Sequence, residues 1–206
     1  MMRINNKTGF TLVEMLIAIS IFAVVATLAS SLFSTFANNQ KRTKVSQELL
    51  NNAQYALEII SREVKNNEII TFSSDRDERC QNLPAEYSQC LLFTRENGET
   101  AAFVYSGSEL LYVPIDCTED DDGQYSDCAI ANAQQPATVL SADYNKVDVT
   151  SFAFFLSPDG NPYINDSFNQ QPRVTIKMAV KYSSTKTVEQ VNHYLQTTVS
   201  SRVYKR

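Results

Sequence analysis

The sequence predicts an α+β fold, in which one long N-terminal helix packs against a C-terminal antiparallel β-sheet. Three observations carry this prediction. The chain opens with a long apolar segment, an amphipathic pattern continues that segment without a helix breaker, and alternating segments separated by turn residues fill the remainder. At 206 residues the chain has room for one domain of ordinary size plus an appendage.

The apolar segment, residues 15–37, contains 23 residues without a charge. As a helix it would extend about 35 Å, which is enough to cross a hydrocarbon core of roughly 30 Å. It is longer than the apolar part of an ordinary secretory signal, about 7–15 residues. Arg3 and Lys7 precede it and favour a cytoplasmic N-terminus, although the basic residues within 41–44 weaken this asymmetry. We therefore expect one membrane-spanning helix.

Small side chains recur along this segment at spacings of three, four and seven residues, which places them on one helix face. Such a face lets a second helix approach closely within a membrane. A generic anchor that happens to contain serine is the alternative. The small residues are Ser20, Ala23, Thr27, Ser30, Ser31 and Ser34.

The helical pattern continues beyond the apolar segment. No glycine occurs between Phe10 and Thr94, and Pro84 is the only proline in that interval. Apolar residues at i, i+4 and i+7 spacings predict a helix from about residue 10 to 66, whose second half has one apolar stripe. The stripe consists of Val45, Leu49, Ala53, Ala56, Leu57, Ile60 and Val64.

The rest of the chain is rich in predicted strands. Asn97 and Gly98, between segments 90–95 and 100–106, form the strongest short hairpin signal. Segment 173–182 alternates between an apolar and a polar face, which is typical of an antiparallel sheet with one side in solvent. The expected strands are 90–95, 100–106, 109–115, 147–156, 173–182 and 191–203.

The four cysteines, Cys80, Cys90, Cys117 and Cys128, form no CxxC motif, which argues against a zinc ribbon. Their even number beside a membrane-targeting segment favours disulfides formed outside the cytoplasm. Four cysteines allow three connectivities. Local pairing of the first two and of the last two is favoured because short loops close most easily, and free thiols are the alternative.

Several function classes are disfavoured. The formal charge of −5, with 18 Lys and Arg against 23 Asp and Glu, argues against nucleic acid as a partner. His193, the only histidine, has no evident cysteine or serine partner in the sequence. Because no phosphate loop, nucleophile elbow or paired-carboxylate signature is present either, we expect no catalytic residue, no enzymatic activity and no cofactor.

The acidic loop at 116–127 is the one candidate for a metal ion. Clustered carboxylates around a glycine suit calcium. With Gly123 as the EF-hand glycine, however, Thr118 would stand first and Ala129 twelfth, so both key ligands are missing. A solvated acidic loop is the favoured interpretation, we expect no metal site, and calcium binding stays open.

The stretch GFTLVEMLIAISIFAVVA, which begins at Gly9, resembles the class III signal of type IV pilins and type II secretion pseudopilins. The helix-then-sheet plan is similar to the same family over the rest of the chain, more loosely. The resemblance implies a leader peptide at 1–9, a membrane-spanning and filament-core segment at 10–37, an amphipathic helix extension at 38–68 and a β-rich head at 69–206.

The resemblance also implies roles for three residues. A prepilin peptidase would cleave between Gly9 and Phe10 and would N-methylate the new amine of Phe10. Glu14 would pair with the N-terminal ammonium of a neighbouring subunit. Opposite charges attract far more strongly in a low-dielectric medium than in water, and neither is stable there alone, so the pair would fix the axial register between subunits rather than supply most of the cohesion.

The implied function is that of a minor pilin or pseudopilin, a structural subunit that helps to initiate, cap or assemble a type IV pilus or type II secretion pseudopilus. The chain departs from many members of the family in two ways: its apolar helix lacks a proline, with Ser31 at about the place where many members have one, and all four cysteines lie between residues 80 and 128. The mid-chain cysteines, a sheet that ends at the C-terminus and the segment LQTTVSSRVY (195–204) are more similar to the larger minor subunits of the J/W type. The alternatives are a major pilin that forms the shaft, and a membrane-anchored extracytoplasmic binding protein or adhesin that does not polymerise.

The implied partners are other pilin or pseudopilin subunits, the prepilin peptidase, an inner-membrane assembly platform and membrane lipid before assembly. We expect a single-pass inner-membrane protein whose head lies outside the cytoplasm and which then enters a filament at the cell surface or in the periplasm. The sequence does not choose among secretion, adhesion, motility and DNA uptake.

Overall fold

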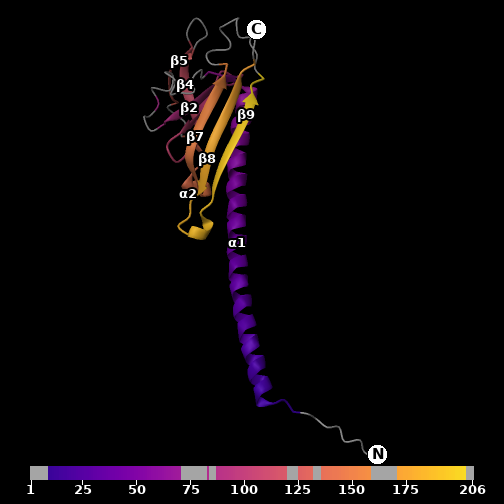
Figure 1. Ribbon diagram of the computed structural model, residues 1–206. Coiled ribbons are helices and arrows are strands. Elements are labelled where there is room, and N and C mark those ends of the chain that lie inside the picture. Colours follow the sequence, from indigo (N-terminus) through magenta and orange to yellow (C-terminus); the bar gives the residue numbers. More distant parts are fainter. Residues whose placement is uncertain are drawn as a thin grey trace, which may run out of the picture. The chain divides into compact units, whose positions relative to one another are not determined.

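The computed structural model describes residues 9–70, 83, 87–119, 125–131, 136–158 and 171–202 (Figure 1). The fold is α+β, as the sequence predicts. Its elements, in chain order, are α1 (Leu12–Asn66), β1 (Glu68–Ile69), β2 (Gln89–Thr94), β3 (Thr100–Tyr105), β4 (Leu110–Glu119), β5 (Tyr125–Ile130), β6 (Ala137–Leu140), α2 (Ala142–Asn145), β7 (Val147–Ser157), β8 (Arg173–Tyr182), the 3-10 turn η2 (Thr187–Glu189) and β9 (Asn192–Ser200).

These elements divide into two compact units, Met1–Thr43 and Lys44–Arg206. The first contains α1 up to Thr43. The second contains the remainder of α1 together with every strand that the structure describes. We call the second unit the head.

The helix α1 is confirmed at both ends, since it begins at Leu12 and ends at Asn66. Neither proline nor glycine interrupts its 55 residues, so the backbone hydrogen bonds continue throughout. Within the head, the predicted apolar stripe is buried in full. The buried residues of α1 are Val45, Leu49, Ala53, Ala56, Leu57, Ile60 and Val64.

The first sheet is antiparallel and six-stranded, with the order β1-β2-β3-β4-β5 and with β6 paired to β4. Its β2 and β3 form the predicted hairpin, in which Leu91 pairs with Phe103. The hairpin turns at Gly98, whose φ of 83° lies in the left-handed region that glycine adopts without strain. The N–H of Gly98 donates to the carbonyl of Arg95 at 2.9 Å and closes the turn.

The second sheet consists of β7, β8 and β9 in antiparallel order, and Figure 1 shows these strands side by side. One face of β8 is buried, as its alternation predicts, whereas Arg173 and Lys177 on the other face are exposed. The buried apolar residues of that face are Val174, Ile176, Met178 and Val180.

The expectation of one sheet with a solvent side is wrong for the six-stranded sheet, because its central strands are buried on both faces. Every residue of β3, TAAFVY, is buried. One face belongs to the main core, and the other forms a second apolar cluster with Leu83 and Tyr87. Continuous apolar runs such as TAAFVY are typical of strands covered on both sides. Elements β1, β5, β6 and α2 have no counterpart among the expected strands.

The main core joins the amphipathic part of α1 to both sheets. Ala53 and Ile60 of α1 are fully buried in one cluster with Phe93, Phe103 and Phe154. The ring centroids of Phe93 and Phe103 are 5.6 Å apart, within the range of favourable aromatic pairs. Small residues on the helix and large rings on the strands therefore fill this interior together.

Tyr105 connects the two sheets. Its hydroxyl, which has one proton to share, lies 2.8 Å from the carbonyl oxygen of Gly107 and 3.1 Å from that of Val149 in β7. The N–H of Val149 in turn donates to the carbonyl of Ser108 at 3.0 Å. Burial, and the nearby charge of Asp148, raise the pKa of the Tyr105 hydroxyl above its ordinary value of 10.0.

Candidate functional site

The residues that precede α1 are open to solvent. Gly9 is exposed, and Phe10 is 85% exposed. A Cβ placed on Gly9 would meet no atom within 4 Å, and Gly9 lacks the positive φ that Gly98 and Gly107 show. The fold itself therefore accepts a side chain at position 9.

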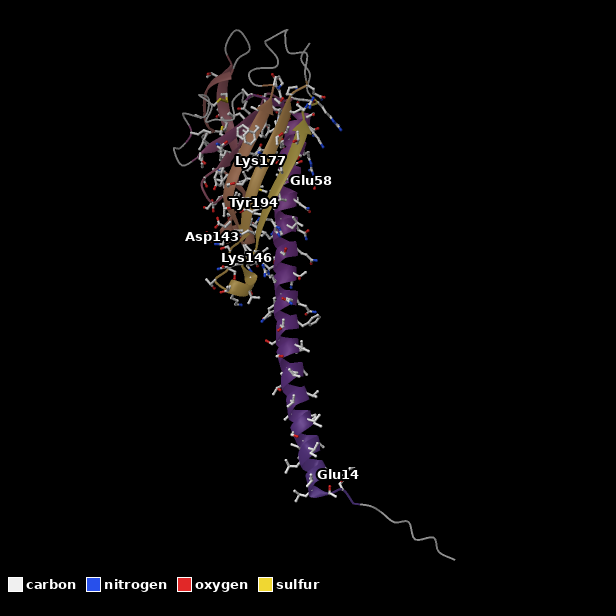
Figure 2. All side chains as sticks on the ribbon, in the orientation of Figure 1. Glu14, Glu58, Asp143, Lys146, Lys177 and Tyr194 are labelled. Carbon is white, nitrogen blue, oxygen red and sulfur yellow. A yellow bond between two sulfur atoms is a disulfide. The ribbon has the colours of Figure 1, made fainter. Side chains whose placement is uncertain are left out.

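Thr11 and Glu14 form a capping box at the start of α1, and Figure 2 shows Glu14 at this end of the helix. The N–H and the hydroxyl of Thr11 both donate to Oε2 of Glu14, each at 2.9 Å. In return, the N–H of Glu14 donates to Oγ1 of Thr11 at 3.3 Å. The box satisfies N–H groups that a helix start leaves open, and a carboxylate there complements the positive end of the helix dipole. The T-x-x-E pattern at residues 11–14 is the sequence signature of a capping box. The interpretation of Glu14 from the sequence considered only its contact with another subunit and missed this local role.

The first unit presents an apolar surface from its first turn. By length and composition, α1 is able to cross a membrane. Its large apolar side chains in this unit are exposed to a degree that soluble domains avoid over a continuous area. They are Leu12, Val13, Met15, Leu16, Ile17, Ile19, Ile21, Phe22, Val24, Val25, Leu28, Leu32, Phe33 and Phe36.

Five of the six hydroxyl side chains of residues 15–37 donate to a carbonyl of the same helix. Ser20 donates to the carbonyl of Ile17 at 2.8 Å, and Ser30 donates to that of Ala26 at 2.9 Å. Because these donors need no water, they lower the free energy of placing the helix in lipid. The same bonds are made by Thr27, Ser31 and Thr35.

Sequence comparison adds one finding about this segment. A family model described as the prokaryotic N-terminal methylation motif matches residues 4–30. The chain carries this motif. It is the class III signal, and it supports a type IV pilin or pseudopilin-like protein. No curated protein and no solved structure matches the chain.

The pilin-type signal and the cysteines lie in different units. Gly9, Phe10 and Glu14 lie together at the start of α1, within the matched segment. In the head, Cys117 of β4 and Cys128 of β5 form a disulfide, as local pairing predicts. Cys90 is disulfide-bonded as well, and Cys80, its partner under local pairing, lies outside the described residues.

His193 has a partner that the sequence does not reveal. Its Nε2 lies 2.9 Å from Oγ of Ser46, a residue 147 positions away in α1. The contact joins the strand β9 to the helix within the head. In the part of the chain that the structure describes, no carboxylate is hydrogen-bonded to His193, so the pair lacks the group that orients histidine in a catalytic triad. Its effect is structural: it fixes β9 against α1.

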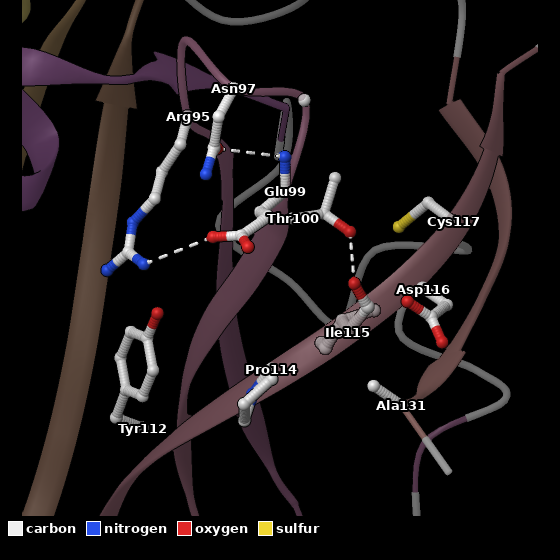
Figure 3. A pocket seen from close by; sticks show the side chains of 11 residues that line it. Arg95, Asn97, Glu99, Thr100, Tyr112, Pro114, Ile115, Asp116, Cys117 and Ala131 are labelled. Atoms are coloured by element: carbon white, nitrogen blue, oxygen red, sulfur yellow. Dashed lines mark hydrogen bonds and ion pairs between the residues drawn. The ribbon is translucent and has the colours of Figure 1, made fainter. Parts of the chain in front are cut away.

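A pocket of about 570 Å³ opens beside the tip of the β2–β3 hairpin (Figure 3). Arg95 is the only basic residue in its described lining, and two carboxylates already neutralise it. Its guanidinium is 3.3 Å from Glu63 and 3.7 Å from Glu99, and it lies over the ring of Tyr112. Asp116 adds another carboxylate to the lining, so the pocket is acidic.

The electrostatics of this pocket also affect Tyr112. Burial raises the pKa of its hydroxyl above the ordinary value of 10.0. The charge of Arg95 opposes this rise, whereas Glu63 and Glu99 add to it. Tyr112 is therefore a neutral hydrogen-bonding group over the physiological pH range.

Within the described residues, no group of three or more His, Cys, Asp or Glu is arranged to hold a metal ion. Residues 120–124 of the acidic loop at 116–127 lie outside the described residues, so the expectation about calcium stays a prediction.

Proposed function

We propose that the protein is a minor pilin or pseudopilin, a structural subunit that helps to initiate, cap or assemble a type IV pilus or type II secretion pseudopilus. One observation carries the proposal: the methylation motif at residues 4–30 coincides with a helix whose apolar side chains are exposed from its first turn. Such a surface requires lipid or other apolar helices around it, and a filament subunit uses both in succession.

Processing would occur at the junction of Gly9 and Phe10. A prepilin peptidase would remove the leader at 1–9 and methylate the new amine of Phe10. Both residues are exposed ahead of the first helical turn, where a protease reaches the backbone. Glycine at position 9 is not required by the fold, which fits a requirement set by the peptidase.

Glu14 would act after processing, as the residue that fixes subunit register. While a subunit is alone in the membrane, Thr11 supplies donors to the carboxylate from the same chain. In a filament, the ammonium of a neighbour's Phe10 would offer a full opposite charge, which attracts more strongly in a medium of low dielectric constant. Only one axial offset brings the two charges together, so the pair would select that offset.

The proposed location is a single-pass protein of the inner membrane, with residues 10–37 in lipid and the head outside the cytoplasm. The disulfide Cys117–Cys128 supports this orientation, because disulfides persist in oxidising compartments. The proposed partners are other pilin-type subunits, the prepilin peptidase and an inner-membrane assembly platform. We assign the protein no catalytic role.

Two alternatives differ from the proposal in observable ways. A major pilin would have the same processed N-terminus but would dominate the filament by abundance. A membrane-anchored binding protein or adhesin would keep its leader, or would lose it at another junction, and would stay out of filaments. The minor role is favoured by the mid-chain cysteines, all four of which lie between residues 80 and 128.

Quantitative mass spectrometry of sheared filaments and of membranes from the native cell tests the proposal. We expect methyl-Phe10 as the first residue, at a few copies per hundred of another pilin. Methyl-Phe10 at dominant abundance would indicate the shaft protein instead. A retained Met1 or a different junction, confined to membranes, would reject the pilin assignment.

A further inference from the structure

Charge is unevenly distributed along the chain. Residues 68–170 contain 18 acidic and 4 basic side chains, whereas residues 171–206 contain 1 acidic and 7 basic side chains. The whole chain nevertheless has a net charge of −5. A local excess of basic residues on an acidic protein creates a surface that attracts negatively charged partners.

The basic residues of β8 lie on the outer face of the three-stranded sheet. Arg173, Lys177 and Lys181 alternate along the strand with buried residues, so they point away from the core. On β9, Tyr194 pairs with Ala179 and belongs to the same face. Figure 2 shows Lys177 and Tyr194 together on this sheet.

Two aromatic rings accompany these charges. Tyr194 is 85% exposed and Phe155 of β7 is 44% exposed. The ammonium of Lys177 lies 4.7 Å from the centroid of the Phe155 ring. A shallow pocket of about 430 Å³, lined by Tyr194, Lys177 and the small side chains of Ser151 and Ala179, lies on the same face. Exposed tyrosine beside cations is typical of residues that carry binding free energy at protein interfaces.

We call this surface the basic sheet face and define it by Phe155, Arg173, Lys177, Lys181 and Tyr194. No residue of the described chain covers Tyr194. The three cations and the exposed tyrosine together form a surface that suits a partner with carboxylates.

The head itself carries such a surface in the acidic pocket beside the β2–β3 hairpin. Glu99 and Asp116 line that pocket, and both are exposed. Asp116 forms no ion pair with any residue that the structure describes. Since Arg95 is shared between Glu63 and Glu99, the pocket retains net negative charge. A cationic side chain is the ligand that it fits.

We propose that the basic sheet face of one subunit docks on the acidic pocket of a second copy of this chain. The two surfaces consist of different residues on different sheets, so each contact leaves one basic face and one acidic pocket free. Contacts of this kind are heterologous, because each copy contributes a different surface. The inference rests on the proposed function and deepens it, because it names a contact between the heads of two copies where a filament is initiated or capped.

Photocrosslinking of the full-length chain in native membranes tests the contact. Benzoylphenylalanine in place of Tyr194 is expected to give a dimer whose crosslinked peptide contains Glu99 or Asp116. The matched control is the same crosslinker in place of Val188, which is 40% exposed in η2 and lies off the basic sheet face. A crosslink from position 194 to another protein, or to another part of this chain, would overturn the proposal.

Charge reversal tests the electrostatic basis of the contact. We expect Lys177→Glu and Asp116→Lys each to lower the yield of the dimer about tenfold, and the two substitutions together to restore it, because opposite charges then face each other again. Unchanged yields in both single variants would overturn the proposal. So would binding of a single-stranded oligonucleotide through Lys177 without any dimer, which would assign the face to a polyanion.

The same samples separate this inference from the proposed function. A chain that begins with methyl-Phe10 but gives no dimer crosslink rejects the docking contact alone. A chain that retains its leader rejects the pilin assignment, whatever the crosslinking shows.

Discussion

The carboxylate of Glu14 is held by Thr11, whose N–H and hydroxyl both donate to Oε2 at 2.9 Å. An acidic residue in the middle of a membrane-spanning helix is unfavourable by roughly 2.5–3.5 kcal/mol on insertion scales. Glu14 stands instead in the first turn of α1, where its own chain provides donors and the helix dipole is favourable. The capping box therefore explains how the charge is tolerated before any second subunit is present.

Glu14→Ala should separate processing from assembly. We expect cleavage after Gly9 to continue, because the junction lies outside the helix, and incorporation into filaments to fall, because the register charge is lost. N-terminal mass spectrometry of membranes reports the first quantity, and the ratio of subunit in filaments to subunit in membranes reports the second. Normal incorporation of Glu14→Ala would contradict the register role.

Glu14→Gln serves as the matched control for that experiment. Glutamine keeps an oxygen that accepts from Thr11 and so retains the capping box, but it carries no charge. We expect its incorporation to fall as well. If Glu14→Gln assembles like the wild type while Glu14→Ala does not, the residue acts through the cap alone.

The contact between α1 and the sheets should dominate the stability of the head. Ile60 is fully buried in the main core, so Ile60→Ala should lower the free energy of unfolding by about 2–5 kcal/mol. Tyr55→Ala, five residues earlier on the exposed face of the helix, should change it by less than about 1 kcal/mol. Denaturant unfolding of the full chain in detergent, followed by circular dichroism, measures both. Equal losses would show that the helix packs through another face.

The sequence predicts those parts of the fold that depend on local patterns. The bounds of α1 follow from an apolar run, an amphipathic continuation and the lack of a breaker. The two faces of β8 follow from strict alternation, because the side-chain period of a strand is two. The Asn97–Gly98 turn follows from the need for positive φ. Each of these signals lies within a few residues of the element that it specifies.

The parts that escape prediction depend on residues far apart in the sequence. The pairing of Ser46 with His193 spans 147 positions, and no local pattern indicates it. The ion pair between Glu63 and Arg95 likewise joins α1 to the hairpin. The capping box of Thr11 and Glu14 is different, since its T-x-x-E signature is local and readable. A charged residue in an apolar segment can be held by groups of its own chain, as in the capping box, or by a group of a neighbouring subunit. The second explanation does not exclude the first.

Removal of the Cys117–Cys128 disulfide should destabilise the head moderately. The bridge closes a loop with a sequence separation of 11, and loop-closure entropy then predicts a loss of about 3 kcal/mol for a Cys117→Ser, Cys128→Ser double variant. Denaturant unfolding under oxidising conditions keeps the bond at Cys90 intact and so isolates this one. A stability equal to that of the wild type would mean that the strands β4 and β5 hold the loop closed without the bridge.

Tyr105 should make the stability of the head fall in alkaline solution. Burial and Asp148 raise its pKa above 10.0 in the folded state, so the unfolded chain loses the proton first as the pH rises. The stabilisation is therefore complete below about pH 10 and is lost as the pH rises through the folded pKa.

Tyr105→Phe should lower the free energy of unfolding by about 1–2 kcal/mol at pH 8, because the carbonyls of Gly107 and Val149 lose their donor, and should flatten the decline above pH 10. Part of the decline should persist in this variant, since the pKa of Tyr112 is raised as well. Parallel stability curves for the variant and the wild type across this range would show that the Tyr105 hydroxyl does not couple folding to pH.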